Sequence, residues 1–264
     1  MRFFLGTHQP NWLKLVNVPL FISRRRLTKY KKMPKAKAPW ALDSGGFTEL
    51  SQFGRWTISA EEYVEEIRRF QEVGQLEWCA IQDWMCEPQI INGGGISGRT
   101  SPGTGLSVAE HQRRTVDSLL ELESLAPDVN FAPVLQGWEI KDYWDHLNLY
   151  LQAGIDLQSY EVVGLGSVCR RQNTCEVEQL VRELSEAGIK LHGFGFKLRG
   201  LQRVSGYLES ADSLAWSFDA RRKPPLPRCT HKNCANCVHF ALEWYRNVMR
   251  VIANSTQEPP PAPW

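Results

Sequence analysis

The most specific chemical pattern in the sequence is a group of thiols near the C-terminus. Cys229, Cys234 and Cys237 stand close together, with His231 between the first two. Three thiolates and one imidazole at this spacing supply the four ligands that tetrahedral zinc prefers. The pattern therefore predicts a closed, structural Zn²⁺ site. His239, two residues after Cys237, is an alternative fourth ligand.

A second group of polar residues follows short apolar runs. Asp43, Asp83 and Gln136 each end such a run, and glycines end two others. If the runs are parallel strands of one barrel, their carboxyl ends share a rim, which is where active sites of such barrels lie. Carboxylates, a carboxamide and glycine backbone offer donors and acceptors to a planar heterocycle, although Asp and Gly are also common turn formers. The residues of this predicted binding rim are Asp43, Ser44, Gly45, Asp83, Gln136, Gly137, Gly164, Leu165, Gly166, Gly195 and Lys197.

The charge distribution is uneven. The chain has 31 Lys and Arg against 29 Asp and Glu, but segment 24–37 holds eight of the basic residues and no acid. The remainder therefore has 23 basic and 29 acidic residues, a net charge of −6. A basic segment on an acidic body attracts polyanions by releasing their counterions, although a solvated surface loop explains the same pattern. The residues predicted to bind nucleic acid are Arg24, Arg25, Arg26, Lys29, Lys31, Lys32, Arg113 and Arg114.

Strands and helices must position these groups, and the apolar pattern alternates between the two. Several apolar runs lack polar alternation, as strands buried on both faces do. Ser59 and Glu62 form a capping box for one amphipathic helix, and Gly188 ends another. About eight strands suit an α/β fold, a (β/α)8 TIM barrel that is irregular in its first strands, and a doubly wound sheet is the competing fold. Strands are expected near residues 2–7, 18–23, 40–43, 77–83, 130–136, 161–166, 190–196 and 212, and helices near 59–70, 107–125, 139–153 and 177–188.

We expect three parts along the chain. Residues 1–226 would form the catalytic barrel, and 227–254 a small zinc-binding segment with a helix packed on the barrel. The proline-rich tail, 255–264, is expected to be disordered. The glycine-rich stretch 92–105 is expected to be a long flexible loop that could act as a lid.

Composition excludes several classes of protein. The chain has 264 residues, of which 42% are hydrophobic and 23% charged, which is ordinary globular composition. No apolar run reaches the roughly 18–20 residues that a membrane span requires. The opening residues lack a secretory pattern, and seven cysteines, an odd number, argue against a disulfide framework. We therefore expect a cytoplasmic protein without membrane contact.

Several motifs resemble one enzyme family. LDSGGF at 42–47 resembles the DSGGF signature of the tRNA-guanine transglycosylases, VLQG at 134–137 their V-Q-G segment, and VGLGS at 163–167 their glycine-rich substrate loop. HGFGFK at 192–197 is similar to the family's next strand, and ADSLAW at 211–216 to the nucleophile segment of the archaeal enzymes. The agreement is closer to the DpdA-type branch of bacteria and their phages, whose members exchange guanine in DNA for a 7-deazaguanine such as 7-cyano-7-deazaguanine. The resemblance spans about residues 2–245 and includes GTHQPNWL, WALDSGGFTEL, QDWMCEP, PVLQGW, GLGSVCRRQ, HGFGFK and SADSLAWS.

The resemblance implies a mechanism. An aspartate attacks the sugar C1′, guanine leaves, and the incoming base displaces the aspartate, as in retaining glycosidases. Asp212 matches the nucleophile, and Asp43 matches the residue that moves protons and positions the base. Asp83 and Gln136 match base-reading positions, and the glycines of VGLGS would offer backbone contacts. The implied partners are a free 7-deazaguanine base and DNA whose target nucleotide is flipped out or single-stranded.

The chain departs from the family pattern at three points. The tRNA enzymes carry C-x-C-x2-C and a distant histidine, whereas here His231 occupies the second position of the cluster. The apolar run Leu214–Phe218 would place Asp212 at the wrong end of a strand; we follow the motif and expect a short strand ending near Asp212, with Asp219 as the rival nucleophile. Lys197 has no counterpart in the tRNA enzymes and is either a phosphate contact or an exposed surface lysine.

Three functions remain open from the sequence. The chain is shorter than many tRNA enzymes, which favours a DNA-guanine transglycosylase. The same chemistry on tRNA is one alternative, and a zinc-stabilised nucleic-acid-binding protein without catalysis is another. Family members that act on tRNA form dimers, so the resemblance allows a homodimer, but no dimer surface can be located in the sequence.

Overall fold

The computed structural model describes residues 1–96, 98–172 and 174–255. The main sheet has nine parallel strands in the order β7-β4-β3-β2-β1-β11-β10-β9-β8. Its two edge strands, β7 and β8, are separated only by Pro133, and they pair with β4 and β9. The strands are β1 (Arg2–Gly6), β2 (Leu20–Ser23), β3 (Trp40–Asp43), β4 (Leu76–Ala80), β7 (Phe131–Ala132), β8 (Val134–Leu135), β9 (Val163–Leu165), β10 (Leu191–Gly193) and β11 (Ser210–Ser213).

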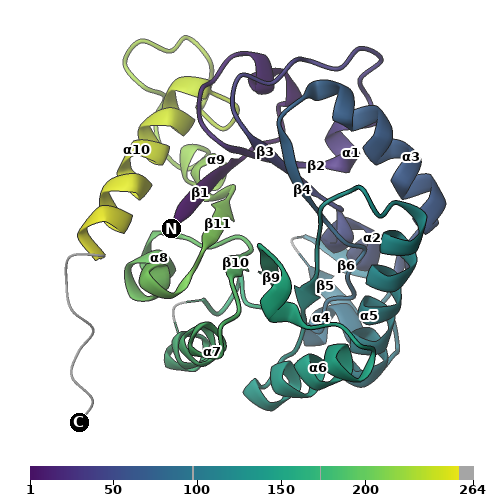
Figure 1. Cartoon of the computed structure of the whole chain (residues 1–264). Helices are drawn as coiled ribbons and strands as arrows, with labels where there is room; N and C mark the ends of the chain where they lie inside the picture. The colour runs from purple at the N-terminus through teal and green to yellow at the C-terminus, as the bar shows by residue number, and fades with distance from the viewer. Residues whose placement is uncertain (97, 173, 256–264) are drawn as a thin grey trace.

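The short segment from β7 to β8 closes the sheet into a barrel (Figure 1). Proline has no N–H to donate, so Pro133 divides one strand of the barrel into two short strands, β7 and β8. These two strands together fill one position in the barrel. The nine strands therefore occupy eight positions, one at each place where a strand was predicted. This confirms the predicted (β/α)8 barrel, and the doubly wound sheet is not the fold.

Helices surround the later strands, as predicted. The capping box of α3 is present, because Ser59 Oγ accepts from the Glu62 N–H at 3.2 Å and the Glu62 carboxylate accepts from the Ser59 N–H at 2.8 Å. The early strands are irregular: only a short 3₁₀ turn, Pro10–Lys14, separates β1 from β2. The helices are α1 (Arg24–Leu27), α2 (Gly46–Phe53), α3 (Ala60–Phe70), α4 (Pro88–Ile91), α5 (Val108–Leu125), α6 (Ile140–Gln152), α7 (Cys175–Glu186), α8 (Leu198–Val204), α9 (Ala215–Ala220) and α10 (Val238–Ser255).

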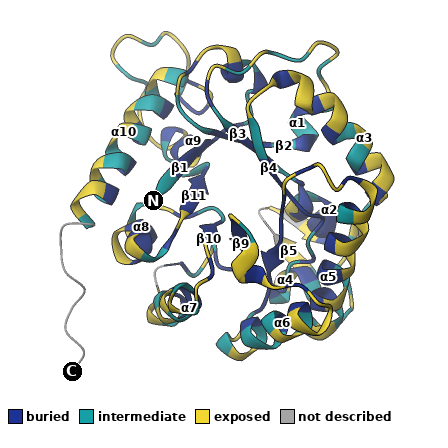
Figure 2. Ribbon diagram, viewed as in Figure 1, coloured by how far each residue is buried: buried dark blue, intermediate teal, exposed yellow. Residues whose placement is uncertain are grey.

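Side chains alternate across each strand and create two apolar layers. Phe3 and Leu5 of β1 pack into the large core between the sheet and the helices. Phe4, between them, belongs to a second cluster together with Phe21 and Trp78, which fills the barrel interior. Figure 2 shows buried residues on the strands and on the helix faces that meet them, and exposed residues on the outer helix faces.

The glycine-rich stretch contains more structure than expected. Its central part forms an antiparallel hairpin of β5 (Gly94–Ile96) and β6 (Arg99–Ser101). At the base of the hairpin the chain segments are in close contact, since a Cβ on Gly103 would lie 2.6 Å from the Gly93 nitrogen. The stretch is therefore a hairpin with a closely packed base, and its use as a lid stays a prediction.

The C-terminal helix α10 packs on the outer side of the barrel, against β1, α8 and α9 (Figure 1). Trp244 of α10 lies 5.9 Å from Phe3, measured between ring centroids. Residues 221–237, which we call the zinc loop, connect α9 to α10. Of the predicted tail, Ser255 ends α10 and the remainder lies outside the described residues. Among the described residues, no helix is long and apolar enough to cross a membrane.

Candidate active site and metal centre

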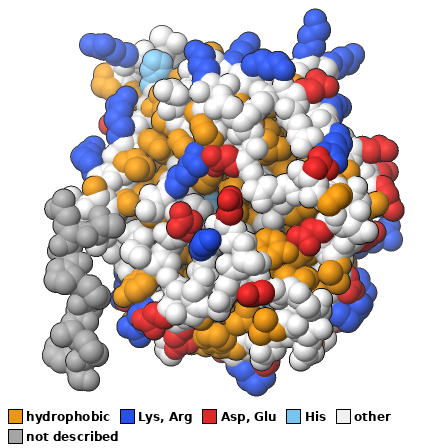
Figure 3. Space-filling view, viewed as in Figure 1, with side chains coloured by type: hydrophobic (Ala, Val, Ile, Leu, Met, Phe, Trp, Pro, Cys, Tyr) orange, Lys and Arg blue, Asp and Glu red, His pale blue; other side chains and the backbone are white. Residues whose placement is uncertain are grey.

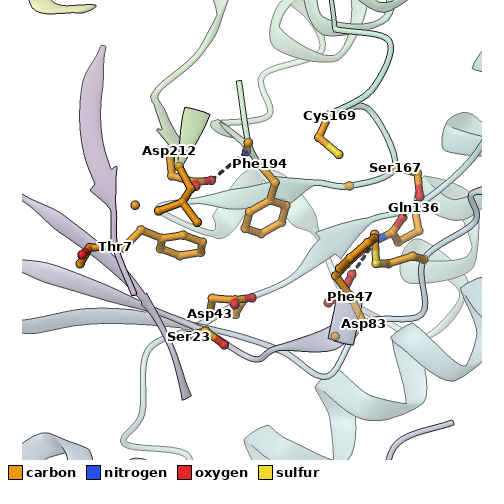
Figure 4. A pocket seen from close by; sticks show the side chains of 18 of the residues that line it. Thr7, Ser23, Asp43, Phe47, Asp83, Gln136, Ser167, Cys169, Phe194 and Asp212 are labelled. Carbon is orange, nitrogen blue, oxygen red and sulfur yellow. Dashed lines mark hydrogen bonds between the residues drawn. The ribbon is translucent and has the colours of Figure 1, made fainter. Parts of the chain in front are cut away.

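A cavity of about 250 Å³ opens at the carboxyl ends of the barrel strands. Its wall is made from residues at or just after the end of each barrel position, from β1 round to β11. Figure 4 shows Asp212 on one side of this cavity, Asp83 and Gln136 on the other, and Asp43 and Phe194 between them. The barrel thus brings together four polar residues that are far apart in the sequence.

The predicted binding rim separates into two groups. Five of its residues line the cavity, as does the predicted nucleophile Asp212; the five are Asp43, Asp83, Gln136, Gly166 and Gly195. The other predicted rim residues are not among its lining residues. These are Ser44, Gly45, Gly137, Gly164, Leu165 and Lys197.

The residues that do not line the cavity support it or lie elsewhere. Gly164 leaves room for Phe194, since a Cβ there would lie 2.4 Å from the Phe194 ring, and Gly137 packs in the same way on Tyr143. Leu165 is buried in the core. Lys197 is exposed and does not line this cavity, so its predicted substrate role stays a prediction.

The turn after β3 holds Asp43 in place. Gly45 has a φ of +83°, a conformation that glycine adopts without strain, and its N–H donates to Asp43 Oδ1 at 3.1 Å. The Ser44 carbonyl accepts from Arg24 Nε at 2.8 Å, which ties the turn to α1. Burial raises the pKa of Asp43, and the nearby charge of Asp212 acts in the same direction. Asp43 is therefore suited to carry a proton.

Asp83 and Gln136 form one hydrogen-bonded unit. Gln136 Nε2 donates to Asp83 Oδ2 at 2.5 Å, and Ser167 Oγ donates to Gln136 Oε1 at 2.6 Å. The Ser167 hydroxyl in turn accepts from the Cys86 N–H at 2.9 Å, so the orientation of the carboxamide is fixed. Burial, with a further contribution from the charge of Asp43, raises the pKa of Asp83 to about 7.

Asp212 lies in β11 and is 7% exposed. Its Oδ1 atom accepts a hydrogen bond from the Gly195 N–H at 2.9 Å. The predicted register near Asp212 is confirmed, because the apolar run Leu214–Phe218 falls largely in α9. Asp219, the rival nucleophile, lies on α9 and does not line the cavity.

The four predicted metal ligands converge in the zinc loop. Cys229 Sγ and Cys237 Sγ are 3.7 Å apart, and His231 Nε2 lies 3.1 Å from Cys234 Sγ. All four donor atoms lie within 4.8 Å of one another. Sulfurs bound tetrahedrally to zinc at about 2.3 Å are about 3.8 Å apart, so this donor set fits zinc. The described residues bring His231, and not His239, into this group.

A family model described as DpdA, DeoxyPurine in DNA protein A, matches residues 1–260. The chain belongs to the DpdA family. No curated protein matches it significantly. Among solved structures, an open-loop conformation of a Sinorhizobium meliloti protein described as an isomerase is similar, with a TM-score of 0.41 and 9% identity over 80% of this chain. The chain spans about half the length of that protein, since the match covers 50% of it.

This DpdA-family chain has a basic groove beside its cavity. The groove has a volume of about 730 Å³ and shares Ser23, Asp43 and Phe47 with the cavity wall. Arg24, Arg25, Arg26 and Lys29 line it, whereas Lys31 and Lys32 are exposed and do not. Four of the eight basic residues of segment 24–37 therefore line the groove beside the cavity.

Four of the predicted nucleic-acid contacts pair with acids, among them Arg25, which pairs with Glu49 at 2.5 Å. Arg24 is the most buried of the four. Its guanidinium is buried, with 4% of the side chain exposed, and pairs with Glu49 at 2.6 Å and Glu66 at 3.0 Å. Arg24 therefore ties α1 to α2 and α3, and its predicted contact with phosphate stays a prediction. Arg113 and Arg114 both pair with Glu110 on α5 and do not line the groove.

The zinc loop adds positive charge that the sequence analysis missed. It carries five basic residues and no acid, and a search for clusters outside segment 24–37 would have found it. Burial and the charges of Arg26 and Arg221 lower the pKa of His8, on the cavity wall, to about 4. Lys and Arg side chains gather along the upper edge of Figure 3, where Figure 1 has the zinc loop and the segment after α1. One arginine from each basic segment, Arg26 and Arg221, therefore lies close enough to His8 on the cavity wall to affect its charge.

Two aromatic side chains of the cavity were also missed. Phe47 is the second residue of α2 and is 38% exposed, and Phe194 follows β10. Both rings line the cavity, where they could stack on a planar base. The family motifs could have indicated both residues, because Phe47 lies in DSGGF and Phe194 lies in HGFGFK.

Proposed function

We propose that this chain exchanges guanine in DNA for a 7-deazaguanine base through a covalent Asp212–deoxyribose intermediate. One observation carries the proposal: in a DpdA-family chain, Asp212 lines the same cavity as Asp43, Asp83 and Gln136. Such a cavity offers a nucleophile, a proton carrier and a base-reading pair around one planar ligand.

The proposed reaction has two displacements. Asp212 Oδ2 bonds to C1′, and the electron pair of the glycosidic bond leaves with guanine N9, which takes a proton from Asp43. The N9–H of the incoming base then loses its proton to Asp43, N9 attacks C1′, and the electron pair of the C1′–O bond returns to Asp212. The raised pKa of Asp43 suits both proton transfers.

Base recognition is assigned to Asp83 and Gln136, with Phe47 and Phe194 as stacking surfaces. An ionised Asp83 accepts from the N–H groups of a guanine-like ring, and the carboxamide offers both a donor and an acceptor. Zinc, held by Cys229, His231, Cys234 and Cys237, is assigned a structural role, because four protein donors leave no open position.

The decisive experiment is mass spectrometry of nucleosides from DNA incubated with the protein and candidate 7-deazaguanines. We expect a 7-deaza-2′-deoxyguanosine among the nucleosides of the DNA, and release of free guanine. A parallel incubation with tRNA separates the alternative substrate, since incorporation into tRNA alone would contradict the DNA assignment. If no modified nucleoside is found in DNA or in tRNA, base exchange is contradicted.

Base exchange should increase as the pH rises through about 7. The pKa of Asp83 is raised to about 7, so below that pH the carboxyl is protonated and no longer accepts with both oxygens. The measurement is kcat/KM for the free base against pH. Asp83→Asn should lower kcat/KM and remove this rising limb, whereas an unchanged limb in that variant would assign it to another group.

The same shift predicts an opposite trend in stability. A carboxyl whose pKa is higher in the folded state than its ordinary value of 3.8 favours the folded state less and less as the pH rises from about 4 to about 7. When Tm is measured at several pH values in this range, it should therefore fall less with rising pH in Asp83→Asn than in wild type.

DNA binding should depend on the groove beside the cavity. Replacing Arg26 and Lys29 together with Ala should weaken binding and reduce the slope of log K against log salt by about 1–2, since each lost phosphate contact removes roughly one unit. Lys141→Ala with Lys190→Ala is a charge-matched control outside the groove. A slope equal to wild type in the Arg26/Lys29 variant would remove this groove from the interface.

A further inference from the structure

A histidine lies against the proposed nucleophile inside the barrel. His192 of β10 is fully buried, at 0% exposed. Its Nε2 atom is 3.4 Å from Asp212 Oδ1, and its Nδ1 atom is 2.8 Å from Ser210 Oγ. Among the described residues, Nε2 has no hydrogen-bond partner that meets strict geometry. The Nε2 atom therefore faces the carboxylate of Asp212, while Nδ1 is held by Ser210.

The surroundings leave the imidazole little freedom to turn. Four aromatic rings pack around it, with centroids 4.7 Å away for Trp78, 5.0 Å for Phe194, 5.5 Å for Phe21 and 5.9 Å for Phe4. A buried polar ring in such an apolar layer carries a desolvation cost, and most buried polar groups have a partner that offsets it. Ser210 and Asp212 are the polar groups within reach of its two nitrogens.

The contacts also decide where the ring proton sits. A neutral imidazole carries one proton, on Nδ1 or on Nε2. A proton on Nδ1 would turn the Nε2 lone pair toward the carboxylate oxygen, which repels it. A proton on Nε2 gives an N–H that faces Asp212 Oδ1, and the Ser210 hydroxyl then donates to Nδ1. The carboxylate of Asp212 therefore favours the Nε2–H tautomer, and the Ser210 hydroxyl, which can donate or accept, is compatible with it.

The two oxygens of Asp212 consequently differ. Oδ1 accepts from the Gly195 N–H at 2.9 Å and faces His192, whereas no hydrogen bond reaches Oδ2 from the described part of the chain. An oxygen without a protein donor keeps its electron pairs for an electrophile. The other oxygen accepts from one N–H and faces the imidazole, an arrangement that resembles an oxyanion site for a carboxylate that leaves C1′.

We infer that His192 is a positioning residue for Asp212, an inference that rests on the proposed function. It directs Oδ2 toward C1′ and stabilises the carboxylate when the C1′–Oδ2 bond breaks and its electron pair returns to Asp212. The separation of 3.4 Å is long for a hydrogen bond. Contacts of this kind often shorten only in the reacting complex.

The test compares two substitutions of the histidine in the full-length protein. His192→Leu keeps an apolar side chain but removes the N–H, and His192→Gln retains an N–H donor. The measurements are single-turnover rates of adduct formation on DNA, rates of adduct breakdown on adding a 7-deazaguanine, KM for the base, and Tm. We expect His192→Leu to slow both rates by about 10–100-fold with little change in KM, and His192→Gln to recover at least half of that loss on a logarithmic scale.

Two further variants separate positioning from packing. Phe4→Leu disturbs the same aromatic layer without lining the cavity, so it should lower Tm while both rates stay near wild type. Ser210→Ala removes the hydroxyl that holds the Nδ1 side of the imidazole and should slow both rates by about 3–10-fold. This variant is the deciding test of the positioning role if both His192 variants fail to fold.

The outcomes are distinguishable. Wild-type rates in His192→Leu, equal losses in the Leu and Gln variants, or an equal loss in Phe4→Leu would overturn the role of His192 and leave the proposed function standing. A wild-type protein that forms no adduct and exchanges no base contradicts both proposals.

Discussion

Replacing Asp212 with asparagine is expected to abolish base exchange while leaving the fold intact. An amide is a poor nucleophile, so no covalent bond to C1′ forms, and the rate should fall by at least about 10³-fold. The amide oxygen can still accept from the Gly195 N–H, so Tm should stay close to that of wild type. The measurements are nucleoside mass spectrometry and a denaturing gel that detects protein bound covalently to DNA.

Asp219→Asn is the matched control for this variant. Asp219 lies on the helix that follows β11, outside the cavity, and the variant should exchange bases at the wild-type rate. Loss of activity in the Asp219 variant together with activity in the Asp212 variant would move the nucleophile to α9. If neither the wild type nor any variant forms an adduct, the non-catalytic, nucleic-acid-binding alternative gains support.

Replacing Cys234 with serine is expected to release the metal and destabilise the end of the barrel. Cys234 is fully buried and packs with Ala220 of α9 and with Cys237. The Ser217 hydroxyl of α9 donates to the Ala235 carbonyl at 2.8 Å, so the zinc loop and the helix after Asp212 are joined. Because structural zinc contributes free energy of folding directly, we expect a fall in Tm of roughly 5–15 °C.

The metal content and the melting curve should be measured on the same preparations. Cys175→Ser is the control, because Cys175 is an exposed cysteine at the start of α7 and takes no part in the cluster. Wild type and Cys175→Ser should bind one zinc per chain, and a chelator should lower the Tm of both. A Cys234→Ser protein that keeps its zinc and its Tm would contradict the assigned ligand set.

Much of the architecture follows from patterns that the sequence displays locally. The positions of the eight barrel strands, the Ser59 cap of α3 and the spacing of the zinc ligands were predictable, because each depends on residues a few positions apart. The family resemblance also set the register at Asp212, where apolar periodicity alone pointed the wrong way.

Other features could be known only from the tertiary structure. Arg24 belongs to a basic run, yet Glu49 and Glu66, supplied by α2 and α3, bury it, whereas Lys29 stays at the groove. His192 is one polar residue in an apolar strand, and nothing near it in the sequence indicates that Asp212 lies 3.4 Å away.

The physical reason is the range of the interactions involved. Hydrophobic periodicity, caps and ligand spacing act along a few residues of chain, so the sequence by itself determined the elements and the metal-binding cluster. The direction of a side chain and the charge beside it depend on the register between β10, β11 and β1 and on helices that pack from distant segments. Barrel closure therefore decided which of the predicted residues share the cavity and which support it from behind.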